Sequence, residues 1–379
     1  MKKPLSSSIS HIDVIYAGGT FGSFGQPLAP LSAKAFLPIL HQIMPNTTDI
    51  TLNMVDNSLI KDSSQFDVPD FLTFYRLILK HYAQGQRYFL LITGTDTLSY
   101  LGAFLAEAFA NSDIRLVLTA SMRPLLDPTR LTDYVINPQS DAKDNFHLAI
   151  GQLLKNKAGV YVAIGNDVWP AQTVQKLHSH DMLAFSGHQK VGYPASSYQD
   201  RLSQTTKTMW LEQHQPNIGK INHNHNHNHN NGQSSLLKKP CCVQVIYALP
   251  SHIDDHADEH MNIHASQLRH IITQAEKNNT PTAVILMSYG EGNFPKSHAM
   301  QTMLNLAYQA GIMVINSSQS LLGGVSDNYA AGSWLADCHV ISGGRLTLPA
   351  IYARLLWLLL TCDSPKRRRQ RWQHTVSQV

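Results

Sequence analysis

Short apolar runs that each end in a turn are the feature that limits the fold of this chain most. The run from Ile12 to Ala17 leads directly into Gly18-Gly19-Thr20. The run from Tyr88 to Thr93 ends in the same way, at Gly94-Thr95-Asp96-Thr97, and segments apolar at helical spacing, such as Leu98 to Ala110, follow such turns. Further runs of this kind are Ile114 to Thr119, Gly159 to Ile164, Cys242 to Leu249, Ala283 to Met287 and Ile312 to Asn316. Strands that are apolar on both faces and alternate with helices predict an α/β fold, with a mostly parallel sheet flanked by helices.

A change of composition divides the chain, whose 379 residues are enough for two domains at about 150 residues each. The stretch from Ser203 to Lys239 is polar, and Asn222 to Asn231 is a literal Asn-His repeat. Because such a stretch cannot build a core, it predicts a mobile interdomain linker. We therefore expect a larger N-terminal domain at residues 1–205, a polar linker at 206–240 and a smaller C-terminal α/β domain at 241–379.

Charge and cysteine content exclude several classes of function. The chain has 30 Lys and Arg against 26 Asp and Glu, a formal net charge of +4. Much of this excess lies in a basic tail at Lys366 to Arg369, which we expect to be a solvated end. The body therefore lacks the positive charge that a nucleic-acid backbone requires of its partner. The 4 cysteines, in a chain of this length, do not predict a disulfide framework.

The two ends of the chain indicate where the protein is found. Residues 1–8 have a basic start but no apolar stretch behind it, so they do not predict a secretory signal. The longest apolar run near the C-terminus, Leu355 to Leu360, is far too short to cross a bilayer. We expect a soluble cytoplasmic protein without a membrane partner.

The threonines at two strand ends are the residues around which chemistry can be built. Thr20 and Thr95 each follow a buried strand and lie in a turn that contains glycine. Ligands of open parallel sheets bind beyond the carboxyl ends of the strands, and glycine leaves backbone N–H groups free to point at them. Two hydroxyls there, with Asp96 beside one of them, suit nucleophilic attack on a carbonyl. A threonine needs a base to take its proton, and Lys176 serves if burial or a neighbouring charge keeps part of it neutral.

Motifs along most of the chain resemble those of one known family. They are Ala17-Gly18-Gly19-Thr20-Phe21-Gly22, Asp62-Ser63-Ser64-Gln65-Phe66, Gly94-Thr95-Asp96-Thr97, Thr119 to Pro124, Ser140 to Asn145, Lys176 with Asp181 and Phe185 after it, Ser288 to Pro295, and Gly311 to Gly332. The family that they resemble is the asparaginase/glutaminase family, and the Asp-Ser-Ser loop is closer to its cytoplasmic type I branch. The resemblance covers most of residues 10–205 and 241–360 in the right order, which makes it specific although no single motif is.

The resemblance implies an amidohydrolase that converts L-asparagine to L-aspartate and ammonia by double displacement. Thr20 is the nucleophile that it implies. The same resemblance assigns proton transfer to Thr95, Asp96 and Lys176, with Lys176 polarising Thr95. It implies neither a cofactor nor a metal ion.

The resemblance also implies how the substrate is held. Ser63 and Ser64 would bind its α-carboxylate, and Asp96 its α-ammonium group. Active sites of the family are completed across a close dimer, so we expect a homodimer or homotetramer. Asn293 lies where the neighbouring subunit would approach.

Three positions depart from the family pattern. The family usually places a tyrosine in the mobile loop after its first motif, whereas the segment from Phe24 to Leu31 has none. Ala17 replaces a threonine, which predicts a small change in packing, and Arg345 to Pro349 lacks an acidic residue that often helps to bind the substrate amine. We expect Thr20 to be activated without a phenol, with slow turnover, and the preference for free asparagine to be looser.

Other functions compete with this interpretation. One is an amidase that acts on another amide, such as glutamine or a larger peptide-like substrate, and another is a catalytically silent relative that binds an amino acid. Retention of both threonines together with Asp96 and Lys176 argues against the silent relative, because a pure binder needs no such set. A dinucleotide fold is a poor alternative, because no acidic residue occurs between Asp13 and Asp49 to bind a ribose.

Histidine-rich segments raise the question of a metal. His252, His256, His260 and His264 recur every four residues, a spacing that suits both a helix face and metal ligands. We favour an exposed polar helix there. The Asn-His repeat preorganises nothing, and we expect no metal in catalysis.

Overall fold

The computed structural model describes residues 11–45, 50–130, 133–155, 157–188, 240–250, 262–326 and 330–376. The chain divides into two compact units, Met1–His227 and Asn228–Val379. The Asn-His repeat and all of the predicted linker except Pro240 lie outside the described residues, so the predicted domain limits stay predictions.

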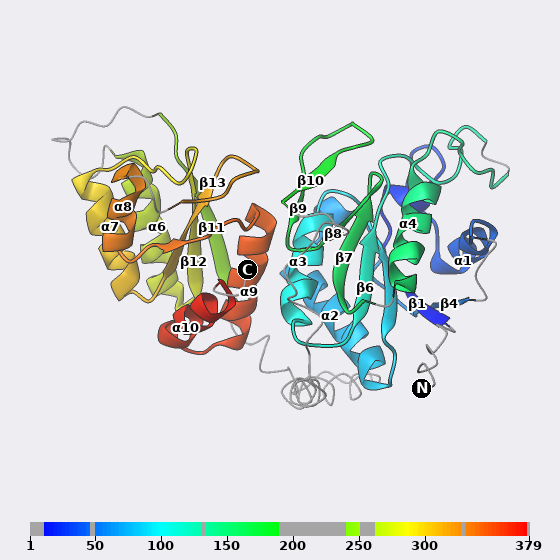
Figure 1. Ribbon diagram of the computed structural model, residues 1–379, viewed down its shortest axis with the longest axis horizontal. Helices are drawn as coiled ribbons and strands as arrows, with labels where there is room; N and C mark the ends of the chain where they lie inside the picture. The colour runs from blue at the N-terminus through cyan, green and yellow to red at the C-terminus, as the bar shows by residue number, and fades with distance from the viewer. Residues whose placement is uncertain are drawn as a thin grey trace, which may run out of the picture. The chain divides into compact units, whose positions relative to one another are not determined.

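The first unit is built on a six-stranded sheet in the order β4-β1-β5-β6-β7-β8 (Figure 1). Its strands are β1 (His11–Tyr16), β4 (Thr51–Met54), β5 (Tyr88–Ile92), β6 (Arg115–Thr119), β7 (Gly159–Ile164) and β8 (Asp167–Pro170). All pair in parallel except β8, which runs antiparallel to β7. Since β1 and β5 are direct parallel neighbours with Tyr16 opposite Ile92, the turns after these two strands start side by side.

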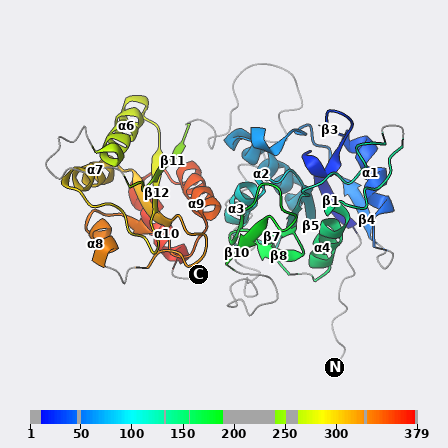
Figure 2. The ribbon, with the colours of Figure 1, turned by 90° about the horizontal axis from the view of Figure 1, so that it is seen from above.

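Helices cover both faces of this sheet (Figure 2). They are α1 (Ala33–Gln42), α2 (Val68–Ala83), α3 (Leu98–Ala108) and α4 (Ala142–Leu154). On one face, Tyr16 shares a buried cluster with Phe36 of α1 and Phe146 of α4. On the other, α3 lies so close to β7 that a Cβ on Gly102 would be 3.2 Å from Val162 Cγ2. The apolar strands are therefore buried from both sides, as their composition predicts.

Side-chain caps fix where two of these helices begin. Ser32 accepts a hydrogen bond from Ala35 N at the start of α1. Asp67 and Asp70 form a reciprocal capping box at the start of α2. Asp70 also lies 2.6 Å from Lys61 Nζ, so the start of α2 is joined to the loop that follows Lys61.

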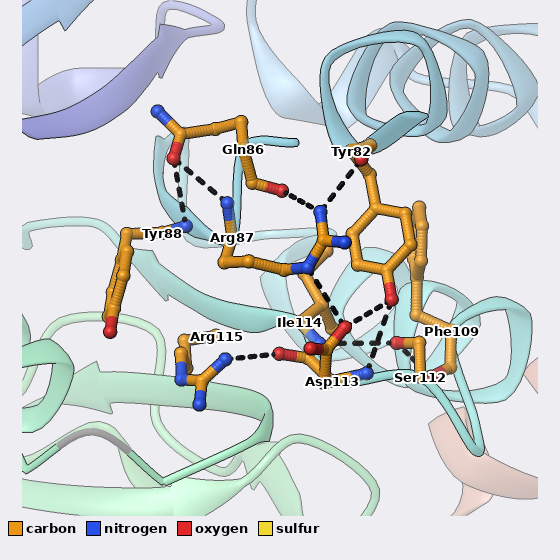
Figure 3. A network of polar contacts seen from close by, with 9 residues as sticks. All are labelled: Tyr82, Gln86, Arg87, Tyr88, Phe109, Ser112, Asp113, Ile114 and Arg115. Carbon is orange, nitrogen blue, oxygen red and sulfur yellow. Dashed lines mark hydrogen bonds and ion pairs between the residues drawn. The ribbon is translucent and has the colours of Figure 1, made fainter. Parts of the chain in front are cut away.

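Polar side chains form a dense network at the amino ends of β5 and β6 (Figure 3). Asp113 accepts a hydrogen bond from the Tyr82 hydroxyl and forms an ion pair with Arg87 at 3.0 Å. The Arg87 guanidinium carbon lies 4.0 Å from the centre of the Tyr82 ring, and Arg115 Nη1 donates to the Asp113 backbone oxygen at 2.6 Å. Burial, together with Asp113, raises the pKa of Tyr82 to about 12, so the phenol remains a donor. The network ties α2 to the starts of both strands.

The second unit contains a four-stranded sheet in the order β11-β12-β13-β14, with all pairs parallel. The strands are β11 (Cys242–Tyr247), β12 (Thr282–Ser288), β13 (Met313–Ser318) and β14 (Ile341–Ser342). The helices are α6 (Ile263–Asn278), α7 (His298–Gln309), α8 (Ala330–Asp337), α9 (Leu348–Thr361) and α10 (Pro365–Val376). Residues of α6, α7 and α8 form one buried cluster with the sheet, and residues of α9 and α10 form another on its opposite face. The predicted fold class is thus confirmed, with a larger N-terminal sheet that is mostly parallel and a separate C-terminal α/β unit.

The basic tail is not the solvated end that the sequence suggested. It forms α10, and Arg368 and Trp372 on this helix are 6% and 1% exposed. Trp372 packs into the cluster of α9, with the Arg354 guanidinium carbon 5.3 Å from its ring. Arg368 Nε donates to the Cys362 backbone oxygen at 3.0 Å. The prediction holds for Lys366 and Arg367, which are exposed, but it did not take account of Trp372, which anchors the helix.

The histidine at the end of the predicted polar helix also behaves differently. Helix α6 begins at Ile263 after the N-cap Asn262, and His264 is buried rather than exposed. Its Nε2 accepts a hydrogen bond from Leu249 N at 3.2 Å, and burial lowers the pKa of its ring. His264 is therefore a core residue that supports a loop. His252, His256 and His260 lie outside the described residues.

Of the helices in the described part of the chain, none has the length and apolar character that a bilayer crossing needs.

Candidate active site

The turns after β1 and β5 touch through their backbones. Gly18 and Gly19 have φ of +91° and +79°, values that favour glycine. A Cβ on Gly19 would lie 2.3 Å from Gly94 N and 2.4 Å from Gly94 Cα. Only glycine fits at such an approach, and Thr20 and Thr95 directly follow the two residues in contact. The turns that carry Thr20 and Thr95 are thus brought together at the level of their backbones.

A lysine joins the second of these turns. Lys176 ends the short strand β9 (Val174–Lys176), which pairs with β10 (Phe185–Gly187) and sets Phe185 opposite Lys176. Lys176 Nζ donates to Thr95 Oγ1 at 2.9 Å and to Asp96 Oδ1 at 2.8 Å. Thr95 is 8% exposed, whereas the Asp96 side chain is 54% exposed. The three residues thus form a bonded group with one protected hydroxyl and one carboxylate open to solvent.

The loop after Lys61 lies against both turns. Lys61 N donates to Ala17 O at 3.2 Å, and a Cβ on Gly18 would lie 2.7 Å from Lys61 O. The loop continues into the 3₁₀ turn η2 (Ser63–Gln65), whose first N–H groups are capped by Asp62: Ser64 N donates to Asp62 Oδ1 at 2.8 Å. Ser63 is buried and Ser64 is exposed.

Lys61 itself anchors this loop by its charge. Burial raises the pKa of Asp70, but the hydrogen bond from Lys61 and those from Asp67 outweigh it, so the pKa stays below its usual value. The Lys61 ammonium also lies 5.6 Å from the Phe66 ring centre. The loop is therefore held at its start by an ion pair and a cation–π contact.

A fourth segment, at the end of β6, is held by a carboxylate. Asp141 accepts hydrogen bonds from Met122 N at 3.0 Å and Arg123 N at 3.1 Å. Asn145 Nδ2 donates to Ala120 O at 3.0 Å and to Asp141 Oδ2 at 2.8 Å. Two of the motifs found in the sequence, Thr119 to Pro124 and Ser140 to Asn145, are therefore bonded to each other. Sequence reasoning matched these motifs but assigned them no role.

Both halves of the chain match domain models of one family. Residues 11–208 match the model described as "Asparaginase, N-terminal", and residues 259–371 match the "Glutaminase/Asparaginase C-terminal domain". The chain belongs to the asparaginase/glutaminase family. Membership supports an amidohydrolase activity of the L-asparaginase type.

Curated relatives of this asparaginase-family chain cover most of its length. L-asparaginase 1 of Escherichia coli K12 is 26% identical over 356 residues, which are 92% of this chain and 91% of the relative. The 60 kDa lysophospholipase of mouse is 23% identical over 91% of this chain, but the match spans 58% of that longer protein.

Solved asparaginase structures have the same fold. The thermostable L-asparaginase from Thermococcus kodakarensis has a TM-score of 0.67 at 22% identity, over 95% of this chain and 96% of the other. A probable cytoplasmic L-asparaginase from Campylobacter jejuni has a TM-score of 0.63 at 21% identity, over 95% and 98%. At these identities the likeness shows the fold alone.

The segment in which the family usually carries a tyrosine is a small hairpin here. Strand β2 (Ser23–Phe24) pairs with β3 (Ala29–Pro30) after the 3₁₀ turn η1 (Thr20–Gly22). The Phe24 ring lies 5.2 Å from the Tyr134 ring, centre to centre. Tyr16, beneath the turn, is already hydrogen-bonded. Its hydroxyl donates to Gly22 O at 3.1 Å, and burial raises the pKa of this phenol. The approach of Tyr134 to this hairpin could not be predicted from the sequence, because the contact depends on how a distant loop folds back.

Asn293 is not among the residues that the first unit brings together. It lies in the second unit, in a tight turn after β12 where Asn293 N donates to Tyr289 O at 2.9 Å and Tyr289 N donates to Asn293 O at 3.0 Å. Asn316 Nδ2 supports the turn by donating to Gly292 O at 2.9 Å. The geometry of the turn is thus well fixed, and the predicted substrate contact of Asn293 stays a prediction.

Clusters of His, Cys, Asp and Glu that could hold a metal ion are absent from the residues that the structure describes.

Proposed function

We propose that this protein hydrolyses L-asparagine to L-aspartate and ammonia, with Thr20 as the nucleophile. The observation that carries the proposal is the pair of hydrogen bonds from Lys176 to Thr95 and Asp96, at 2.9 and 2.8 Å, beside the turn that presents Thr20. A lysine bonded at once to a hydroxyl and a carboxylate suits the movement of protons during acyl transfer.

In the first half of the proposed reaction, Thr20 Oγ1 forms a bond to the side-chain amide carbon of asparagine. The C–N bond then breaks, and the amide nitrogen leaves as ammonia after taking up the proton that Thr20 gave up. The product is an aspartyl ester on Thr20. Backbone N–H groups of the two glycine-containing turns would stabilise the negative charge on the carbonyl oxygen during this step.

In the second half, water attacks the ester carbon, the bond to Thr20 Oγ1 breaks and the hydroxyl regains a proton. We assign the placing of this water and its proton to Thr95, whose hydroxyl accepts from Lys176 and so directs its own hydrogen elsewhere. Thr95 would take a proton from this water while its own proton passes to Thr20 Oγ1, so its hydroxyl is restored at the end of the step. The hydrogen bond from Lys176 would stabilise negative charge on Thr95 Oγ1 during this transfer, and Asp96 holds the Lys176 ammonium group in place.

The residues proposed to bind the substrate lie on the loop after Lys61 and on the turn after β5, which lie against each other. Ser63 and Ser64 would bind the α-carboxylate, and the exposed carboxylate of Asp96 would bind the α-ammonium group. Asn293, from the second unit, would complete the site across a homodimer or homotetramer interface. Fixing both α-groups directs the side-chain amide toward Thr20, and such positioning contributes much of the rate in reactions of this kind.

The same proposal covers location and cofactors. We propose that the protein acts in the cytoplasm and needs no cofactor; the Campylobacter jejuni protein of similar fold is named a probable cytoplasmic L-asparaginase. Fractionation of cells that express the full chain tests the location.

Ammonia release tests the function. We expect the protein to release ammonia from L-asparagine, and to do so less well from L-glutamine. Thr20→Ala and Thr95→Ala should each lower kcat by at least roughly 10³-fold, because the nucleophile and its partner hydroxyl act as a unit.

The alternatives make different predictions in the same assay. A preference for glutamine or another amide would keep the dependence on Thr20 but change the best substrate. If wild-type turnover is no faster than that of the variants while calorimetry still detects amino-acid binding, the protein is a silent binder and the proposal is wrong.

A further inference from the structure

One hydrogen bond joins the loop proposed to bind the substrate to the turn proposed to move protons. Thr97 Oγ1 donates to Ser63 O at 2.9 Å across 34 positions of sequence. Thr97 follows Asp96 directly, so the bond lies one residue away from the group formed with Lys176.

The hydroxyl of Thr97 donates to Ser63 O instead of capping its own helix, the role that its position at the start of α3 favours. Thr97 is the N-cap of α3, where a threonine oxygen ordinarily accepts a hydrogen bond from an N–H of the first turn. Its side chain makes no such bond here. The helix begins through the backbone, with Leu101 N donating to Thr97 O at 2.9 Å. The hydroxyl is thus oriented toward the loop and not toward its own helix.

A second contact makes the same junction tight. A Cβ on Gly94 would lie 2.4 Å from Ser63 Oγ and 2.9 Å from Ser63 Cβ. Ser63 is 2% exposed. Its side chain is therefore pressed against the backbone of the turn while its carbonyl is held by Thr97. Because the side chain and the carbonyl group of Ser63 are both held in place, the position of the exposed Ser64 next to it is fixed as well.

We propose that Thr97 is a positioning residue of this site, whose hydroxyl sets the distance between the loop of Ser63 and the turn of Thr95. This distance decides whether one substrate can place its α-carboxylate on the loop and its α-ammonium group on Asp96 at the same time. Thr97 therefore tunes affinity for a small amino acid that carries both groups. The inference rests on the proposed function for its substrate class.

The role has a kinetic signature. The hydroxyl bonds to a backbone carbonyl of the loop and not to Lys176, so its loss shifts the loop and leaves the proton-transfer group intact. Binding before the chemical step should suffer more than the step itself. The expected signature is a raised KM with a smaller change in kcat.

Three variants test this signature with L-asparagine as substrate. Thr97→Val removes the hydroxyl at nearly constant shape, and we expect KM to rise by roughly tenfold or more while kcat falls by less than about threefold. Thr97→Ser keeps the donor and should restore KM to within about twofold. Thr73→Val is the matched control, because Thr73 Oγ1 also donates to a backbone carbonyl, Pro69 O, at 2.9 Å, but on the exposed side of α2. It should leave both constants unchanged.

The outcomes separate positioning from folding. A KM of Thr97→Val within twofold of the wild-type value overturns the inference. If Thr97→Val does not fold, Thr97→Ala removes the same donor with less bulk, and an unchanged KM there overturns the inference equally. If neither variant folds while Thr97→Ser is normal, Thr97 serves folding and the inference is also wrong.

A binding measurement keeps this test apart from that of the function. L-aspartate carries both α-groups, so calorimetry should give a higher Kd for Thr97→Val than for the wild type. A wild type that binds L-aspartate but releases no ammonia contradicts the proposed reaction and leaves Thr97 to be judged by Kd. A wild type that does neither overturns both.

Discussion

The two ends of the strands in the first sheet are held together in different ways. We call the end at which the parallel strands begin the amino edge, and the end at which they finish the carboxyl edge. At the amino edge, side chains make the links: Asp113 pairs with Arg87 and Tyr82 (Figure 3). Asp13 of β1 pairs with His81 of α2 at 2.6 Å. At the carboxyl edge, the backbones of Gly19 and Gly94 come so close that a Cβ on Gly19 would lie 2.3 Å from Gly94 N.

The difference shows how a parallel sheet divides its tasks. Side chains that satisfy one another at the amino edge stabilise the fold but leave nothing for a ligand. Glycines at the carboxyl edge bring two turns together while the next side chains, Thr20 and Thr95, remain available for chemistry. Changes at the carboxyl edge should therefore affect activity, and changes at the amino edge should affect stability.

The largest expected effect comes from replacing one positively charged residue at each edge with methionine. Lys176→Met removes the donor to Thr95 and should lower kcat by about 10²–10⁴-fold. Its pairing with the open carboxylate of Asp96 contributes little to stability, so the midpoint of thermal unfolding should change little. Arg87→Met is the matched change at the amino edge. It should leave kcat within about twofold and lower the free energy of unfolding by roughly 1–3 kcal/mol, because Asp113 loses a partner. The comparison fails if Arg87→Met lowers kcat as much as Lys176→Met does.

Exchanging a glycine at each edge should have the next largest effect. Gly19→Ala places a Cβ 2.3 Å from Gly94 N, so the two turns must separate, and activity should fall at least roughly 10²-fold. Gly85→Ala is the control, because Gly85 also has a positive φ, of +101°, but has nothing within 4 Å of the added Cβ. It should cost about 1 kcal/mol of backbone strain and leave kcat within about twofold. Ammonia release and thermal melts of both variants separate the effect of close approach from that of backbone conformation.

The smallest effect on activity, with a distinct pH dependence, is expected at Asp13. Burial raises the pKa of this carboxyl, but hydrogen bonds from His81, Asn53 and Gln86 outweigh burial, so the pKa lies below its usual value. A carboxyl whose pKa is lowered by folding stabilises the folded state above the unfolded pKa of about 3.9, and this contribution is lost as the pH falls through the folded value.

Asp13→Asn should therefore lower the free energy of unfolding by roughly 1–3 kcal/mol near pH 7, with kcat within about twofold of the wild-type value. The difference in stability should shrink as the pH falls below about 4. Urea unfolding of both proteins across this range gives the measurement. A difference that stays constant with pH would mean that the charge of Asp13 does not contribute.

Much of the fold follows from patterns in the sequence. The apolar runs around Ile12 to Ala17 and Tyr88 to Thr93 predict buried strands of a mostly parallel sheet, and both are strands of that sheet, β1 and β5. Residue type alone made Lys176 a candidate base, but only the family resemblance linked it to Thr95 in particular, because β9 and its turn carry no periodic signal of their own.

What could not be predicted depends on partners far apart in the chain. The bond that Thr97 donates to Ser63 O, and those that Asp141 accepts from the segment after β6, depend on the angles of several turns, which local composition does not specify. The burial of one face of α10 could have been predicted, because Arg368 and Trp372 are four residues apart and so share that face. The charge of the surrounding residues led instead to the prediction of a solvated end.

The most direct test of the proposed chemistry is to trap the intermediate. Wild-type protein mixed with L-asparagine and quenched in acid within the first turnovers is digested and its peptides are analysed by mass spectrometry. We expect an aspartyl ester on the peptide that contains Thr20, absent from the Thr20→Ala variant. Ammonia release without an ester on Thr20, or with the ester on Thr95 instead, would contradict the assignment of the nucleophile.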